Sequence, residues 1–228
     1  MIAAVSPVPL LPPYLAIYLL RIRRWDEASI GIVPMPPPKL RPATINDATL
    51  LAELVNHAGE GIPLYLWDQM AEPGEAAWNV GRRRASREEG SFSYRNATII
   101  EQDSQCAGCL IGYEIPNNPD PIPDDLPKMF VPLQELENLA SNTWYINVLA
   151  VRLKFRRLGF GTKLLGLAHE TAEALGKPGL SVIVSDANSV AHRLYDRCGY
   201  RESGIRPMVK ENWENDGQNW VLLTKHLR

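Results

Sequence analysis

The feature that most constrains the fold is an uninterrupted succession of strand, glycine turn and helix in the second half of the chain. Residues 143–152 (TWYINVLAVR) have the aromatic and β-branched composition of a buried strand. They lead through residues 156–161 (RRLGFG) into an amphipathic helix expected over 158–175, and Gly176 is its stop signal. Another apolar strand is expected at 180–185, so this order predicts an α/β domain whose helix packs on a sheet.

Further elements are expected on both sides of this unit. Those on the N-terminal side are an edge strand at 39–42, an apolar helix capped by Asn46 and Asp47, a second helix starting near Pro63, a hairpin of strands 93–101 and 106–115, and a proline-rich loop over 116–132. Those on the C-terminal side are a helix at 188–198, a strand starting at 199, and a strand at 220–225 that closes the sheet.

Composition and charge exclude several classes of protein. The 228 residues are 45% hydrophobic and carry a net charge of −2, which suits a globular domain with a sizeable core. Such a chain has no overall basic field, so neither nucleic acid nor an anionic membrane is an expected partner. The three cysteines are too few for a disulfide framework and suggest the cytoplasm. Cys106 and Cys109 form a CxxC pair without further ligands at zinc-finger spacing, so two ordinary thiols and no metal are expected.

The N-terminal segment has an apolar stretch that does not suit a membrane span. Prolines at positions 7, 9, 12 and 13 interrupt it and leave residues 14–20 as the unbroken apolar run. Three arginines follow this run, whereas a secretory signal carries its positive charge before it. We therefore expect an accessory arm over residues 1–34 and a domain over residues 35–228.

The glycine turn at 156–161 has the character of an anion site. The first N–H groups of a helix lack partners, and the helix dipole adds positive potential there. Glycines let a phosphate approach the backbone closely, and Arg156 and Arg157 add charge. The turn is not a Walker loop, because Gly161 is followed by Thr162 and Lys163. It is not a dinucleotide fingerprint either, since it holds only two glycines.

Two motifs in this region resemble those of a known family. Residues 148–151 (VLAV) with 156–165 (RRLGFGTKLL) are similar to motif A of the GNAT acetyltransferases, whose signature is Arg or Gln, two residues, Gly, one residue, and Gly or Ala. Asn188, Ala191, Leu194, Tyr195 and residues 198–200 (CGY) resemble the family's motif B. The resemblance covers residues 143–204. It implies a mixed, mostly antiparallel sheet of six or seven strands, splayed at the centre and flanked by helices.

The resemblance also implies acetyl-CoA as co-substrate, held in the gap of the splayed sheet. Backbone groups of Leu149 and Val151 would pair with the pantetheine arm, and N–H groups from Arg157 to Thr162 would hold the pyrophosphate. Phe160 would contact the cofactor or anchor its helix to the sheet. The cofactor-binding residues that the resemblance gives are Leu149, Ala150, Val151, Arg156, Arg157, Leu158, Gly159, Phe160, Gly161, Thr162, Asn188, Ala191 and Tyr195.

In the family, a tyrosine like Tyr195 lies beside the thioester sulfur and could protonate the departing thiolate. From its residue pattern alone, Tyr195 could equally be a core aromatic. The general base stays open among Glu60, His57 and an ordered water, because the inward positions of the central strand hold Tyr145 and Asn147. Acceptor recognition is expected from residues 56–67, the proline-rich loop, Tyr145 and residues 207–219. The last segment is either an acidic and aromatic wall or a solvated loop.

These features favour transfer of an acetyl group to a primary amine of a small molecule or peptide, by direct attack in a ternary complex. One alternative is a non-catalytic acyl-CoA-binding regulatory module. Another is an acyltransferase for a different donor such as succinyl-CoA, which the basic run Arg82, Arg83 and Arg84 could accommodate, although that run could also be a solvated helix face. Dimerisation is common in the family, and a homodimer stays open.

Overall fold

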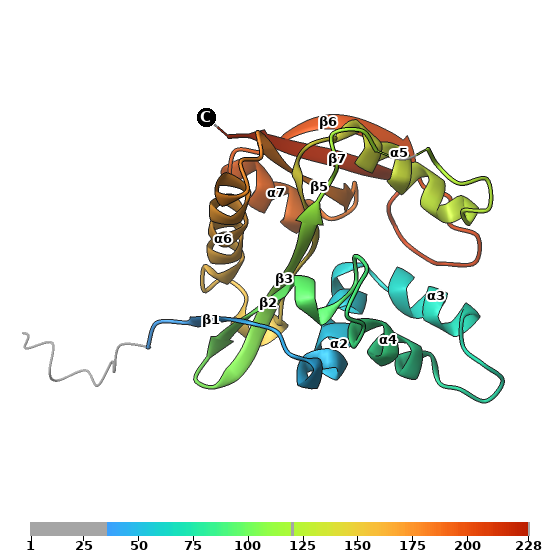
Figure 1. Cartoon of the computed structure of the whole chain (residues 1–228), viewed down its shortest axis with the longest axis horizontal. Coiled ribbons are helices and arrows are strands. Elements are labelled where there is room, and N and C mark those ends of the chain that lie inside the picture. Colours follow the sequence, from blue (N-terminus) through green and yellow to red (C-terminus); the bar gives the residue numbers. More distant parts are fainter. Residues whose placement is uncertain (1–35, 120, 228) are drawn as a thin grey trace, which may run out of the picture. The chain divides into compact units, whose positions relative to one another are not determined.

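The computed structural model describes residues 36–119 and 121–227. Its centre is a seven-stranded sheet in the order β1-β2-β3-β4-β5-β7-β6 (Figure 1). The strands are β1 (Lys39–Pro42), β2 (Ala97–Gln102), β3 (Gln105–Glu114), β4 (Trp144–Val151), β5 (Gly179–Ser185), β6 (Arg201–Pro207) and β7 (Asn219–His226). Only β4 and β5 pair in parallel among these neighbours; the other pairs are antiparallel. The predicted mixed, mostly antiparallel sheet is confirmed.

Helices cover both faces of the sheet (Figure 1). They are α2 (Ala48–Ala58), α3 (Ile62–Gln69), α4 (Ala77–Ala85), α5 (Val131–Leu139), α6 (Phe160–Ala174) and α7 (Ser189–Arg197). Within residues 36–119 and 121–227, four 3-10 turns accompany them: η2 (Ile45–Asp47), η3 (Tyr94–Asn96), η4 (Lys128–Phe130) and η5 (Leu153–Phe155). One apolar cluster joins α6 to the centre of the sheet, a second joins α2 and α4 to its N-terminal half, and a third joins α5 to β7.

Strand β4 bends at Asn147. In the β3–β4 ladder, Gly112 is opposite Ile146 and Ile111 is opposite Val148, so Asn147 is an extra residue. Such a β-bulge turns the strand and increases its local twist. The parallel pairing of β4 with β5 also ends here, at the pair of Ile146 and Val182. The two central strands therefore diverge beyond Ile146, which is the predicted splay.

The predicted hairpin is present, with a shorter first strand than expected. Asp103 and Ser104 have φ values of 51° and 59°, the left-handed conformations that a two-residue type I′ turn needs. The expected strand start at Ser93 is wrong. Ser93 is the N-cap of η3, and its buried hydroxyl accepts a hydrogen bond from the Arg95 N–H. Serine side chains often bond nearby backbone donors in this way, which competes with strand pairing.

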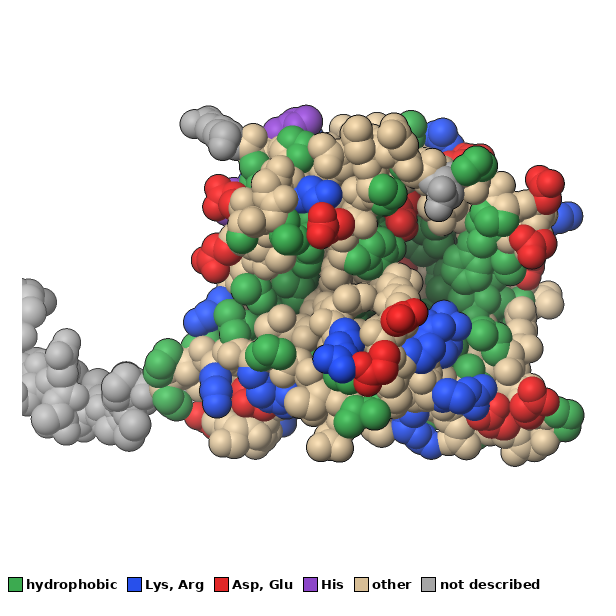
Figure 2. Space-filling model, in the orientation of Figure 1, with side chains coloured by type: hydrophobic (Ala, Val, Ile, Leu, Met, Phe, Trp, Pro, Cys, Tyr) green, Lys and Arg blue, Asp and Glu red, His purple; other side chains and the backbone are tan. Residues whose placement is uncertain are grey.

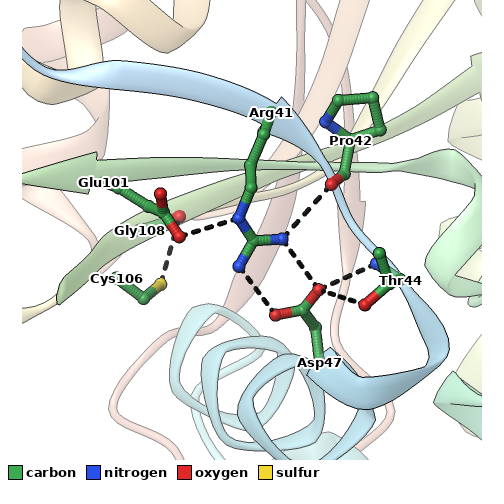
Figure 3. A network of polar contacts seen from close by, with 7 residues as sticks. All are labelled: Arg41, Pro42, Thr44, Asp47, Glu101, Cys106 and Gly108. Carbon is green, nitrogen blue, oxygen red and sulfur yellow. Dashed lines mark hydrogen bonds and ion pairs between the residues drawn. The ribbon is translucent and has the colours of Figure 1, made fainter. Parts of the chain in front are cut away.

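A polar network fastens the edge strand β1 to the rest of the domain. Figure 3 shows the Arg41 guanidinium between two carboxylates, with two bonds of 2.9 Å to Asp47 and one of 2.7 Å to Glu101. Asp47 also accepts bonds from the N–H and hydroxyl of Thr44. Asp47 holds the N-cap position of α2 as expected, but its side chain makes no capping bond to that helix. It instead forms a capping box with Thr44, which is the N-cap of η2, and Asn46 lies within this turn.

Several element boundaries also differ from the sequence prediction. The proline-rich loop was expected to reach residue 132, but α5 begins at Val131 because Pro132 occupies a first-turn position that favours helix entry. Helix α6 begins at Phe160 rather than at 158, after the left-handed Gly159. Strand β7 does not close the sheet. Its buried side chains place it between β5 and the exposed β6.

The predicted accessory arm over residues 1–34 lies outside the described residues. In the part of the chain that the structure describes, no helix is both long enough and apolar enough to cross a membrane. The cysteines there are all free, and burial raises the pKa of the Cys106 and Cys109 thiols.

Candidate active site

The glycine turn between β4 and α6 presents a run of free backbone donors. Arg157 has φ 65° and Gly159 has φ 82°, so the chain passes twice through the left-handed region before α6 begins. The first N–H of this helix to bond a carbonyl is that of Lys163, which donates to Gly159 over 3.0 Å. Within the described residues, the N–H groups from 157 to 162 make no hydrogen bond. These N–H groups lie at the N-terminal end of the 15-residue helix α6, where the helix dipole is positive.

Side chains around this turn divide between packing and solvent. Phe160 is buried, 6.1 Å from Phe155 between ring centroids, so it anchors α6 to the sheet. A Cβ on Gly161 would lie 3.0 Å from Leu194 of α7, which explains a glycine where two helices approach closely. The sequence-predicted Arg156, Arg157, Leu158 and Thr162 are exposed. The turn is therefore open to a ligand from solvent.

The backbone of β4 beside this turn has an unpaired edge. Arg152 N–H donates to the Ala107 carbonyl of β3 over 2.8 Å. Because backbone groups alternate along a strand, those of Ala150 also face β3, and those of Leu149 and Val151 face the gap left by β5. The Val151 carbonyl accepts a 3.3 Å bond from Arg156 Nε. Apart from this side-chain bond, the edge of β4 at the gap has no partner among the described residues and can pair with an extended amide-bearing ligand.

Asn188 is the N-cap of α7 rather than its first residue. Its Oδ1 accepts a hydrogen bond from the Ala191 N–H at 3.1 Å. Its Nδ2 donates to Glu60 Oε1 at 2.8 Å. The expected helix start at 188 is wrong by one residue, since the side chain of Asn188 caps the helix that it precedes. The structure thus joins a motif residue to a carboxylate 128 positions away.

Tyr195 is 4% exposed and lies against Tyr200 at a centroid distance of 5.2 Å. Burial raises the pKa of its phenol, with a smaller contribution from Cys198, so the group stays protonated at neutral pH. Its hydroxyl makes no hydrogen bond with the described residues. Tyr195 packs on the α6 side of the sheet, yet it is close enough to act on the pKa of Tyr145, which faces the other side.

On that other side, a cavity of about 640 Å³ opens between α3, residues 126–133 and the diverging ends of β4 and β5. We call it the central cavity. Its lining is mostly apolar and aromatic, and Figure 2 shows a hollow of hydrophobic side chains on this face. Tyr145 and the bulged Asn147 bring polar groups to it, and among the described residues Glu60 and Arg84 bring the charges.

Glu60 is held at the cavity in an unusual backbone conformation. Its φ is 53°, which is uncommon for a residue with a side chain and which the surrounding structure must hold in place. Besides Asn188, the Asn215 amide donates to its carboxylate at 2.7 Å, and the Trp213 indole donates to its carbonyl at 3.2 Å. A carboxylate has about four acceptor positions, so lone pairs remain for a ligand.

The other open candidate for the base, His57, is exposed and does not line the cavity. Its Nε2 lies 2.7 Å from Arg156, which can only donate, so the nitrogen must accept there.

The segment 207–219 was expected to be either an acidic and aromatic wall of the acceptor site or a solvated loop, and the structure shows features of both. Its carboxylates Glu211, Glu214 and Asp216 are exposed and outside the cavity lining, as the solvated-loop alternative has it. Trp213 is buried and stacked on Trp220 at 6.0 Å. Asn215, which holds Glu60, was missed, because a lone asparagine in a loop carries no sequence signal for such a contact.

The sequence matches the acetyltransferase (GNAT) family over residues 63–200, more than half of the chain. The chain belongs to the GNAT acetyltransferase family. The matched range includes the glycine turn, the free edge of β4 and α7. No curated protein sequence matches the chain significantly.

Solved structures agree on the fold. The crystal structure of an acetyltransferase has 22% identity and a TM-score of 0.57, and the match covers 83% of this chain and 100% of that one. An N-acetyltransferase from Staphylococcus aureus Mu50 has 19% identity and a TM-score of 0.56, covering 82% and 100%. Ard1 from Thermoplasma volcanium has 14% identity and a TM-score of 0.51, covering 84% and 98%. This GNAT chain therefore has the acetyltransferase fold along its described length.

Proposed function

We propose that this GNAT protein is an acetyl-CoA-dependent N-acetyltransferase that acetylates a primary amine of a small molecule or peptide in the cytoplasm. The observation that supports this proposal is the arrangement of groups around the point where β4 and β5 diverge. Free backbone donors and a free strand edge lie at one end, and a cavity with a carboxylate lies at the other. Donor and acceptor can then meet between β4 and β5.

The donor would bind along the α6 side of the gap. N–H groups from Arg157 to Thr162 suit the pyrophosphate, and the exposed guanidiniums of Arg156 and Arg157 add positive charge. Leu149 and Val151 suit the pantetheine amides through their backbone groups. Ala191 and Leu194 of α7 pack against the apolar cluster that contains α6, and Leu194 lies close to Gly161 of the turn. Helix α7 therefore forms part of the donor side of the gap. Acetyl-CoA supplies the activated thioester carbonyl.

Glu60 is the best-placed acceptor for the proton of the incoming amine. Direct attack needs a neutral nitrogen, whereas an alkyl ammonium has a pKa of about 10.4, so a base must take a proton. Among the three candidates, Glu60 lines the cavity and has its carboxylate held by Asn188 and Asn215. The amine nitrogen then bonds to the thioester carbon as the carbon–sulfur bond breaks.

Tyr195 would donate a proton to the departing thiolate. Its raised pKa keeps the phenol protonated, and its hydroxyl has no partner among the described residues that would compete. Tyr195 lies on the α6 side, and Glu60 lies on the cavity side. The two proton transfers thus take place on opposite sides of the splay.

Calorimetric titration with acetyl-CoA, with dephospho-CoA and succinyl-CoA as comparators, tests the donor site. We expect micromolar binding of acetyl-CoA, followed by release of free thiol in the presence of amines. Failure of all three ligands to bind would refute the proposal. Binding without turnover across a broad amine panel would favour the non-catalytic module.

A further inference from the structure

Arg84 is the cation of the central cavity, and it has no acidic partner among the described residues. Its neighbours on α4 both have side-chain partners: Arg82 donates to the neutral amide oxygen of Asn79, and Arg83 forms an ion pair with Glu75. Arg84 differs from both in being half-buried rather than exposed. The charge that acts on it is that of Arg87, which is also positive.

A half-buried guanidinium without a counter-ion is costly, because burial removes water that no protein acid replaces. Burial lowers the pKa of Arg84, and the repulsion from Arg87 adds to this. The cavity lining to which Arg84 belongs is mostly apolar or aromatic and includes Trp67, Met70 and Phe92. An anion from outside the chain would remove this cost.

The central cavity thus contains opposite charges on separate wall segments. Glu60 precedes α3 and is fixed by Asn188 and Asn215, whereas Arg84 comes from the last turn of α4. No ion pair joins these two side chains, so both charges remain available to a ligand. Apolar side chains such as Leu66 and Phe130 complete the lining. A ligand with a positive and a negative group joined by an apolar body would complement both.

We infer that the acceptor is an amine that also carries a carboxylate, with Arg84 binding the carboxylate while Glu60 receives the amine. The inference rests on the proposed N-acetyltransferase function and names its acceptor class. The planar guanidinium presents paired donors that match the two oxygens of a carboxylate. A carboxylate on the acyl group of the donor has the same chemistry, so the experiment separates the two sources.

The probes are ω-amino acids of increasing chain length, phenylalanine and short dipeptides, each as the free acid and as its carboxamide. In the longer ω-amino acids each pair differs in one charge and almost nothing else, whereas the carboxamide of phenylalanine also has a lower amine pKa, so its rates are compared per neutral amine. Rates are measured with acetyl-CoA, and binding to the CoA-saturated protein is measured by calorimetry. We expect the best free acid to exceed its carboxamide by roughly 10- to 100-fold in kcat/KM, the range for a hydrogen-bonded charge.

Arg84→Met should abolish this preference for the acid mainly through KM, and Arg84→Lys should retain part of it. Arg82→Met, on the exposed face of the same helix, is the matched control and should change nothing. Melting temperatures of all variants separate a loss of binding from a loss of folding.

Equal rates for acids and carboxamides in the wild type, or an equal effect of Arg84→Met on both, would overturn the inference. So would a preference for succinyl-CoA over acetyl-CoA that disappears in Arg84→Met, because the carboxylate site would then serve the donor. If acetyl-CoA binds but no acid does, the inference fails while the donor site stands. If acetyl-CoA itself does not bind, the proposed function fails first.

Discussion

At the scale of residues, Tyr195 provides the sharpest test of the chemistry. Replacing it with phenylalanine removes the hydroxyl and keeps the ring that packs against Tyr200. We expect the acyl-transfer rate to fall by roughly 10²-fold, as for loss of a general acid, with acetyl-CoA affinity little changed. Single-turnover kinetics and calorimetry measure the two quantities. A rate equal to that of the wild type would leave Tyr195 a core aromatic only.

Glu60 offers a second test at this scale, because its role as a base predicts a particular pH profile. Glu60→Gln retains an oxygen for the bond from Asn188 but loses the acceptor for Asn215 and cannot take a proton. We expect kcat/KM to fall by roughly 10²-fold near pH 7 and to recover as the pH rises towards the pKa of the amine, where neutral amine is supplied by solution. His57→Gln is the control for the other candidate. A deficit that stays constant with pH would indicate positioning rather than proton transfer.

At the scale of elements, the glycine turn and α6 form the unit that should decide donor binding. Gly161→Glu places bulk beside Leu194 and negative charge among the free N–H groups, so we expect acetyl-CoA binding to be lost. Gly166→Glu is the matched control on the same helix, since Gly166 is exposed and a Cβ there meets nothing within 4 Å. Circular dichroism establishes folding. Unchanged affinity in a folded Gly161→Glu protein would place the phosphates elsewhere.

Elements with a strong local signal were predictable from the sequence. The central strand and α6 follow from their apolar patterns, the turn between them follows from its glycines, and the hairpin follows from polar residues between two β-rich segments. Helix α5 was missed because it is short, and Pro132 in its first turn reads as part of the proline-rich loop. The contact of Glu60 with Asn188 and Asn215, and the position of Arg84 in the cavity, depend on segments far apart in the chain. No local sequence pattern predicts such long-range contacts.

At the scale of the whole molecule, the network of Arg41, Asp47 and Glu101 should make stability depend on acid. The hydrogen bonds from Arg41 lower the pKa of Asp47 from 3.8 to about 2, and those from Thr44 add to this. The carboxylate thus stabilises the fold above the pKa it has in the unfolded chain. This contribution is lost as the pH falls from about 4 towards 2.

Asp47→Asn should therefore lower the free energy of unfolding at pH 7 by about 1 to 2 kcal/mol, allowing for screening of the partly exposed pair by water. Because both chains carry a neutral group at low pH, the difference should shrink as the pH drops through this window. Urea unfolding at pH 7, 5, 4 and 3 measures it, with the exposed Asp125→Asn as control. A pH-independent difference would mean that Asp47 acts through its turn geometry with Thr44, and that its charge pairing with Arg41 contributes nothing to the fold.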